Sequence, residues 1–460
     1  MNLEISEPSQ KEIRKKILSM ILPITIENIL QMTAGFVAMA MIGRISAASI
    51  GAVGLSQRIV GIIWALFKGV TTGATVFVAQ AYGANDTIRL KKVVQQTLLS
   101  SILLVLALQQ IIYWFAPDIL KIFGAKGNIL IDGTLYLRTV SWGLPFMAII
   151  LVVTGISQGM GNAKTPAKIA LIMNLINISL GYILIFGPLG LPSIGLKGAG
   201  IAMVSSQFVA ALLGLYVLFN RNGVLGSLFN LDFFKLDIKQ VLEVYRVGSP
   251  SAAESIFWQL SSLLITMMIL SFGELALASY QLGLQTESIS YMPAMGFGIA
   301  ATAFIGQTIG ANNPQLGRKY IKEIVKGSLL VTALASAILL FMPAIVLRLL
   351  TDQQEVIDLG VKYLILMGLV QIPQSMSGVL NGALRGAGYT KVPMIVAGTG
   401  LWAIRIPVSY ILYRYFNTSV TAIWMVMSID LIFRFLLSFY LYKKYDVYNN
   451  SRVVLKEIEI

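Results

Sequence analysis

The chain alternates long apolar stretches with short polar ones along its whole length. Twelve apolar windows fall at 17–42, 51–82, 93–116, 130–159, 167–187, 198–219, 241–270, 277–309, 320–347, 358–384, 393–413 and 418–442. Each window is as long as the roughly 20 residues that an α-helix needs to cross a bilayer, and several are long enough to tilt. The pattern predicts an all-α integral membrane protein with twelve transmembrane helices.

The twelve windows form two copies of six, related by a constant offset of 227 residues. Matched pairs are Pro23 with Pro250, Glu27 with Glu254, "TVFVAQAYGAN" (75–85) with "TAFIGQTIGAN" (302–312), and "GISQGMGNAKTP" (155–166) with "GALRGAGYTKVP" (382–393). Because six is an even number, both copies enter the membrane from the same side, as parallel repeats do. We therefore expect two pseudo-symmetric lobes, an N-lobe of residues 1–222 and a C-lobe of residues 223–460.

Composition supports a membrane protein and removes several kinds of chemistry. Hydrophobic residues make up 56% of the chain and charged residues 12%, about half the share of a soluble protein. The sequence contains no cysteine and no histidine, so thiol catalysis, imidazole relays and the usual zinc ligands are excluded. No G-x-x-x-x-G-K-[ST] nucleotide-binding motif occurs. We expect neither an enzyme nor an ATP-driven pump, and no cofactor.

The first apolar window follows the basic run "KEIRKK" (11–16) and is too long for the core of a signal peptide. We read it as a retained first membrane helix. If the N-terminus is cytoplasmic, the inner segments hold 22 of the 35 basic residues and the outer loops hold six. This bias predicts that both termini lie on the cytoplasmic side. The net charge of +14 then reflects topology and lipid contact, not nucleic-acid binding.

A few ionisable residues lie within the predicted spans. They are Glu27, Arg58, Lys68, Glu254, Glu287, Arg405, Asp430 and Arg434. Each costs about 2.5–3.5 kcal/mol at the bilayer centre, so each should face a cavity or a partner. Asp430 and Arg434 are spaced i, i+4 on one helix and predict a local pair. The repeated Gly-Ala-Asn at 83–85 and 310–312 predicts the end of a helix.

The carboxylates Glu27, Glu254 and Glu287 have two readings. Each one either binds a cation or a proton and couples it to a conformational change, or forms a structural hydrogen bond or ion pair. Arg405 and Arg58 are the candidate partners for such a pair. Glu27 and Glu254 fall at equivalent depths in the two halves, whereas the repeat mate of Glu287 is Val60.

These features together resemble the multidrug and toxic compound extrusion (MATE) transporters of the bacterial NorM-like kind. The resemblance runs from about residue 14 to 443. Its motifs are "GRISAASIGAVGLS" (43–56), "YGAND" (82–86), "GISQGMGNAKTP", "NLIN" (174–177), "LGLPSIGLKGAGIA" (189–202), "MPAMGFGIAATAFIGQTIGANNP" (292–314) and "RGAGYTKVP" (385–393). It implies two six-helix lobes around a V-shaped cleft, and export of cationic or amphipathic drugs in exchange for Na⁺ or H⁺.

The chain departs from the family pattern at three acidic positions. Ala38 stands where many relatives carry a first-helix Asp, and Gly181 stands where they often carry a second one. The tenth-helix Asp of sodium-linked relatives is absent, with Gln371 and Gln374 nearby. The N-lobe site would then retain only Asn174 and Asn177. Among the acids, the resemblance makes Glu254 the first candidate for ion coupling and for a bound Na⁺, followed by Glu27 and Glu287.

The sequence thus favours a secondary antiporter that works by alternating access in the inner membrane of a bacterium. We expect a monomer that binds small organic cations or amphipathic drugs. The residues expected to line the substrate cleft are Asn174, Asn177, Gln281, Gln285, Gln371, Gln374, Met292 and Trp258. Two other readings stay open: a lipid-linked saccharide flippase of the same wider superfamily, and a membrane enzyme or assembly scaffold.

Overall fold

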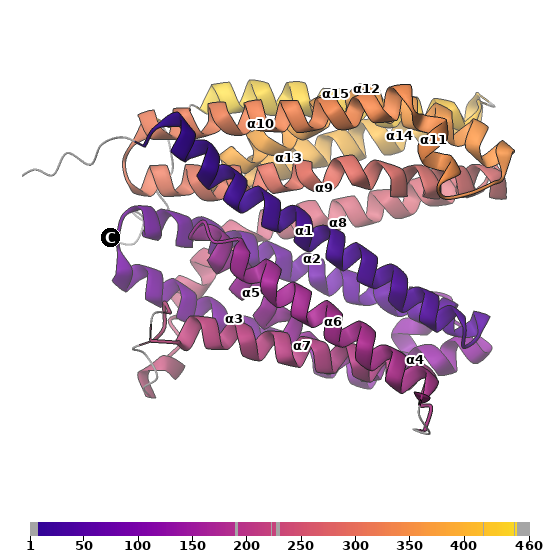
Figure 1. Ribbon diagram of the computed structural model, residues 1–460, viewed down its shortest axis with the longest axis horizontal. Helices are drawn as coiled ribbons and strands as arrows, with labels where there is room; N and C mark the ends of the chain where they lie inside the picture. Colours follow the sequence, from indigo (N-terminus) through magenta and orange to yellow (C-terminus); the bar gives the residue numbers. More distant parts are fainter. Residues whose placement is uncertain are drawn as a thin grey trace, which may run out of the picture.

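A computed structural model describes residues 8–188, 192–221, 223–226, 231–416, 418–445 and 447–448, and in these ranges the chain is helical with no β-strand. The elements are α1 (Gln10–Gly43), α2 (Ala47–Gly83), α3 (Thr87–Ile122), α4 (Gly127–Ser141), α5 (Leu144–Gly159), α6 (Lys164–Phe186), α7 (Gly195–Phe219), η2 (Leu231–Phe234), α8 (Ile238–Leu270), α9 (Glu274–Gly310), α10 (Pro314–Phe341), α11 (Pro343–Arg348), α12 (Gln354–Gly386), α13 (Lys391–Gly398), η3 (Thr399–Arg405), α14 (Ile406–Tyr415) and α15 (Val420–Tyr445). Figure 1 shows the long helices running alongside one another.

The described residues form eleven helices that are long and apolar enough to cross a membrane, or twelve if a bent pair is one span. The bent pair is α4 and α5, which meet at 50°. Each span coincides with a window predicted from the sequence, so the all-α membrane fold is confirmed. The apolar pattern predicts one plain helix in the eleventh window, but a π-helical segment, η3, interrupts it.

Equivalent polar residues end and start the helices in both halves. Asn85 and Asn312 adopt left-handed conformations, with φ of 55° and 51°, so the helix stops predicted at Gly-Ala-Asn are confirmed. The next residues, Asp86 and Asn313, accept hydrogen bonds from the backbone three residues on and cap α3 and α10. All four residues obey the offset of 227, so the repeat seen in the sequence is also a repeat of local structure.

The first helix of each half crosses to the opposite half. The beginning of α1, from Ile13 to Ile24, is buried against α9, α10 and α12 in the C-lobe, while its end packs against N-lobe residues. The beginning of α8 packs at Val244 into the N-lobe core, while its end joins a C-lobe core. Figure 1 shows α1 lying obliquely across the other helices. The division of the chain into lobes after residue 222 stays a prediction. Both α1 and α8 contact helices from each of the two predicted lobes.

The two halves meet closely at the ends of α2 and α9. The Gln80 amide donates to the Gly386 carbonyl at 3.0 Å, and its repeat mate Gln307 donates to the Gly159 carbonyl at 2.8 Å. A Cβ atom added at Gly83 would collide with the Gln307 backbone. Glycine therefore permits a backbone contact between the halves that any side chain would block.

Candidate functional site

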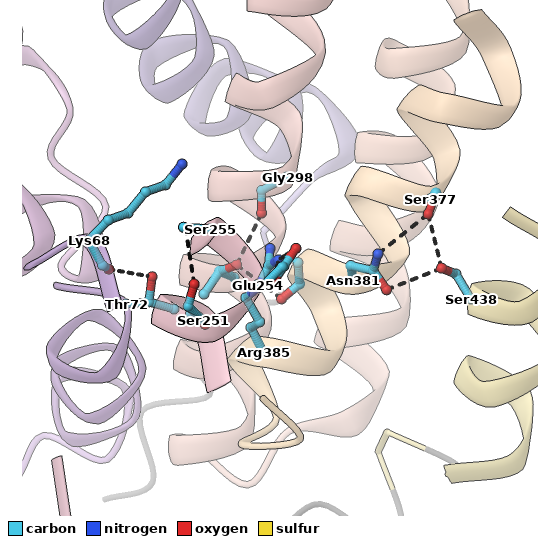
Figure 2. Close-up of polar contacts among 12 residues, drawn as sticks. Lys68, Thr72, Ser251, Glu254, Ser255, Gly298, Ser377, Asn381, Arg385 and Ser438 are labelled. Carbon is cyan, nitrogen blue, oxygen red and sulfur yellow. Dashed lines mark hydrogen bonds and ion pairs between the residues drawn. The ribbon is translucent and has the colours of Figure 1, made fainter. Parts of the chain in front are cut away.

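Glu254 on α8 forms an ion pair with Arg385 in the last turn of α12. Both carboxylate oxygens lie 2.6 Å from Arg385 Nη2, and the two side chains are 14% and 21% exposed. Figure 2 shows the carboxylate and the guanidinium facing each other. A Na⁺ ion at Glu254 would have to displace this guanidinium. The geometry therefore favours the structural reading of Glu254, with a partner that is neither Arg405 nor Arg58.

Among the described residues Glu27 has no such partner, although it is the repeat mate of Glu254. One of its carboxylate oxygens, Oε2, is buried and accepts no hydrogen bond from the described residues. The position equivalent to Arg385 in the first half is Gln158, a neutral residue. The two halves thus place a carboxylate at corresponding points but supply a counter-charge at only one of them. Glu27 remains available to a proton or a cation.

Glu287 on α9 is buried among neutral hydrogen-bond donors. The Tyr363 hydroxyl donates to Glu287 Oε2 at 2.6 Å, and the Gln371 amide donates to Oε1 at 3.2 Å. Ser290 in turn donates to the Gln371 carbonyl oxygen at 2.8 Å. Glu287 is 8% exposed. A buried carboxylate with no ion-paired cation among the described residues is costly while it is charged, so Glu287 is a candidate to take up a proton or a small cation.

A second charged group lies where η3 meets α15. Asp430 pairs with Arg434 on its own helix at 2.9 Å, as the sequence predicts, and with Arg405 at 2.8 Å. The π-helical turn brings Arg405 to this place, and Gly400 leaves room that a Cβ atom would fill against Asp430. Trp258 covers the group: the Arg434 guanidinium carbon lies 4.5 Å from its ring centroid. Two cations at this point share one carboxylate.

The N-lobe contains a cavity of about 190 Å³ between α1, α6 and α7. Its lining includes Ala38, Gly181, Asn174 and Asn177, together with Tyr136, Gln31 and Gln207, and none of the described residues that line it is a carboxylate. Nδ2 of Asn174 is buried and has no hydrogen-bond partner among the described residues. The cavity occupies the place where the resemblance implies an acidic site; Ala38 and Gly181 stand at the acidic positions, and Asn174 and Asn177 are the polar residues that remain.

The remaining predicted cleft residues are distributed over α9 and α12. Gln281, Gln285 and Met292 lie on α9, the helix that carries Glu287. Gln374 lies on α12 beside Gln371, with its Oε1 atom buried and unpaired among the described residues. The described part of the chain holds no cluster of three acidic side chains that could bind a metal ion.

Sequence reasoning missed Arg385 and Tyr363 as functional neighbours. The charge pattern assigns Arg385 to an inner loop, yet it lies inside α12. The sequence presents Tyr363 only as the repeat mate of Tyr136. One signal in the sequence could have singled out Arg385. The residues around it are repeated in the first half, but the position equivalent to Arg385 there is the neutral Gln158.

Comparisons with known proteins agree with this architecture. The MatE family model matches residues 23–183 and 250–411, two segments whose starting points are separated by the repeat offset of 227. A probable multidrug resistance protein NorM from Thermotoga maritima is 31% identical over 429 residues, covering 92% of this chain and 90% of that protein.

Solved structures show the same fold. A crystal structure of MATE in complex with MaL6 superposes with a TM-score of 0.87 at 20% identity, covering 94% of this chain and 96% of the other. The outward-facing conformation of a multidrug resistance MATE family transporter gives 0.85 at 21% identity, covering 94% and 95%. With the family model matching both halves, the chain belongs to the MatE family, the multidrug and toxic compound extrusion transporters of the NorM-like kind.

Proposed function

We propose that this protein is a secondary active multidrug efflux transporter that exchanges cationic or amphipathic drugs for Na⁺ or H⁺. The observation that carries the proposal is the buried carboxylate of Glu287, bonded to Tyr363 and Gln371 and to no basic side chain among the described residues. Loading Glu287 with a proton or Na⁺ removes a buried charge. A site whose charge changes in this way can favour the conformation that opens to one side of the membrane over the conformation that opens to the other side.

The three candidate carboxylates can now be ordered by their surroundings. Glu287 and Glu27 come first because neither has a basic partner among the described residues. Glu254 comes third because Arg385 occupies both of its oxygens. In this scheme Asn174 and Asn177 take part in drug binding in the N-lobe cavity and not in ion coupling.

The test is transport by purified protein in liposomes under an imposed Na⁺ or H⁺ gradient. We expect the wild type to accumulate a cationic dye against its gradient and Glu287→Gln to lose this coupling. Glu254→Gln is the matched control, a loss of the same charge from an existing ion pair, and should retain gradient-driven transport. Coupling that survives in Glu287→Gln but is lost in Glu254→Gln would place Glu254 ahead of Glu287 and contradict the proposal.

The proposed orientation places both termini in the cytoplasm of a bacterial cell, with the ends of α2 and α9 on the inner side. The absence of cysteine makes this testable with single substitutions. Ile88 and Ile122 are exposed at opposite ends of α3. In intact cells, Ile122→Cys should react with a membrane-impermeant thiol reagent and Ile88→Cys should not. The reverse result would invert the topology.

A further inference from the structure

Lys68 is a mid-membrane cation without a carboxylate partner among the described residues. It lies in the middle third of α2, and its Nζ atom is 4.9 Å from the centroid of the Trp64 ring. No acid in the described ranges forms an ion pair with it; the nearby acid, Glu254, pairs with Arg385. A lysine at this depth costs about 2.5–3.5 kcal/mol and by default indicates a functional site.

The surroundings of Lys68 do not supply the missing negative charge. Lys68 lies within electrostatic range of both Arg385 and Glu254. Because Arg385 already pairs with both oxygens of Glu254, these three residues carry one excess positive charge. In Figure 2 the Lys68 ammonium ends away from the Glu254–Arg385 pair. The group spans the boundary between the halves, where Gly69 of α2 lies against Ala252 of α8.

The charged group around Asp430 extends this positive character. Arg405 and Arg434 share that one carboxylate beneath Trp258. Together with Lys68, the two ion-paired groups hold four cations, Lys68, Arg385, Arg405 and Arg434, but only two carboxylates, Glu254 and Asp430.

The repeat shows that this charge is not a requirement of the fold. At an offset of 227, the mates of Lys68, Arg385 and Arg405 are Met295, Gln158 and Ile178. At each of these positions one half has a cation and the other half has a neutral side chain. Because the equivalent positions are neutral in the other half, the helix packing that the two halves share does not require these charges.

We propose that Lys68 and Trp64 bind the acidic group of an anionic or zwitterionic aromatic substrate. The ammonium pairs with a carboxylate or sulfonate, and the substrate ring packs on Trp64 and on the adjacent helix α8, which carries Trp258. The two helices are adjacent at this level, because Gly61 of α2 lies against Gln259 of α8. This inference rests on the proposed efflux function and names the substrate class within it.

The experiment compares two dyes of similar size in liposomes that contain the full chain: carboxyfluorescein, which is anionic, and ethidium, which is cationic. Binding is measured by fluorescence anisotropy and transport by accumulation under a gradient. Lys68→Met copies the residue at the equivalent position of the second half, and Lys68→Arg keeps the charge. We expect Lys68→Met to weaken carboxyfluorescein binding about tenfold or more, with Lys68→Arg within about threefold of wild type. Ethidium binding should change less than about twofold in both variants.

Two results would overturn this inference without affecting the proposed function. One is wild-type protein that binds and transports ethidium but not carboxyfluorescein. The other is Lys68→Met binding carboxyfluorescein as tightly as wild type. Conversely, wild-type protein that binds carboxyfluorescein through Lys68 but transports neither dye under either gradient supports the site and contradicts the efflux function.

Discussion

Glu27 and Glu254 show how a repeated residue can acquire two different environments. Both follow a proline by four residues, so the sequence treats them as equals. The structure gives Glu254 an arginine and leaves Glu27 with a buried, unbonded oxygen among the described residues. The Asp430–Arg434 pair could be predicted because a spacing of four residues on one helix places the two side chains next to each other. The Glu254–Arg385 pair could not, because its partners are far apart in sequence and meet only through helix packing.

Arg385→Gln should recreate at Glu254 the environment that Glu27 has in the first half. Removing the guanidinium leaves a partly buried carboxylate without its counter-charge, which should cost about 3 kcal/mol of stability. Thermal unfolding in detergent should show a lower midpoint for Arg385→Gln. The double variant with Glu254→Gln should recover most of the loss, since no charge is then stranded. Equal midpoints for wild type and Arg385→Gln would show that the pair contributes nothing.

At the scale of elements, the repeat places the same contacts at the same helix ends. Thr75 and Thr302, mates at the offset of 227, donate to the carbonyls of Gly155 and Gly382, both at 3.0 Å. The apolar windows predicted the number and order of the spans, because length and hydropathy are local properties. They could not predict the 50° bend between α4 and α5 or the π-helical turn in η3, since packing against neighbouring helices decides both.

The hydrogen bonds of Gln80 and Gln307 should hold the two halves together, because the first joins α2 to α12 and the second joins α9 to α5. Loss of one such bond is worth about 1 kcal/mol, or roughly a fivefold shift toward separation. Ala79 is fully buried at this contact, near Gly306. We expect Ala79→Cys to react with a thiol reagent about fivefold faster when Gln307→Ala is added.

The control for that measurement is Ala52→Cys, which is buried in the N-lobe core near the other end of α2. Its reactivity should not change with Gln307→Ala. If both cysteines react faster, the substitution has loosened the whole protein. If neither cysteine reacts faster, the Gln307 hydrogen bond does not hold the two halves together.

The start of α8 should depend on pH through Asp237. Its carboxylate caps the helix at Gln240 and lies 2.7 Å from Lys92 Nζ on α3. The hydrogen bond from Lys92 holds the pKa of the Asp237 carboxyl below its usual range. A lowered pKa stabilises the fold above the ordinary value of about 3.9, and this contribution is lost as the pH falls through the folded-state pKa.

Asp237→Asn keeps a capping side chain but removes the charge, so it isolates this effect. Both partners are substantially exposed, and we expect a loss of about 0.5 kcal/mol at neutral pH. The difference in unfolding midpoint between the variant and wild type should vanish at pH values below the lowered folded-state pKa of the Asp237 carboxyl. If the difference in unfolding midpoint persists unchanged at acid pH, the helix cap causes it and the ion pair does not.

At the scale of the whole molecule, the sequence predicts the membrane fold and its two-fold repetition, but not the arrangement of the halves. Nothing in the apolar pattern says that α1 begins against the C-lobe or that α8 begins against the N-lobe. Arg14 on α1 pairs with Glu323 on α10 at 2.6 Å, and Lys92 on α3 pairs with Asp237 at the start of α8. Each half is thus fastened to the other at the start of its first helix.

This exchange of first helices has a consequence for how the protein is made. The N-terminal half leaves the ribosome with Ile13, Ile17 and Met20 directed at a surface that has not yet been synthesised. Until α9, α10 and α12 are synthesised, the start of α1 lacks the C-lobe residues that bury it. Neither half can therefore reach its final structure alone, and maturation must finish with a late reciprocal docking step that joins the first residues translated to the last.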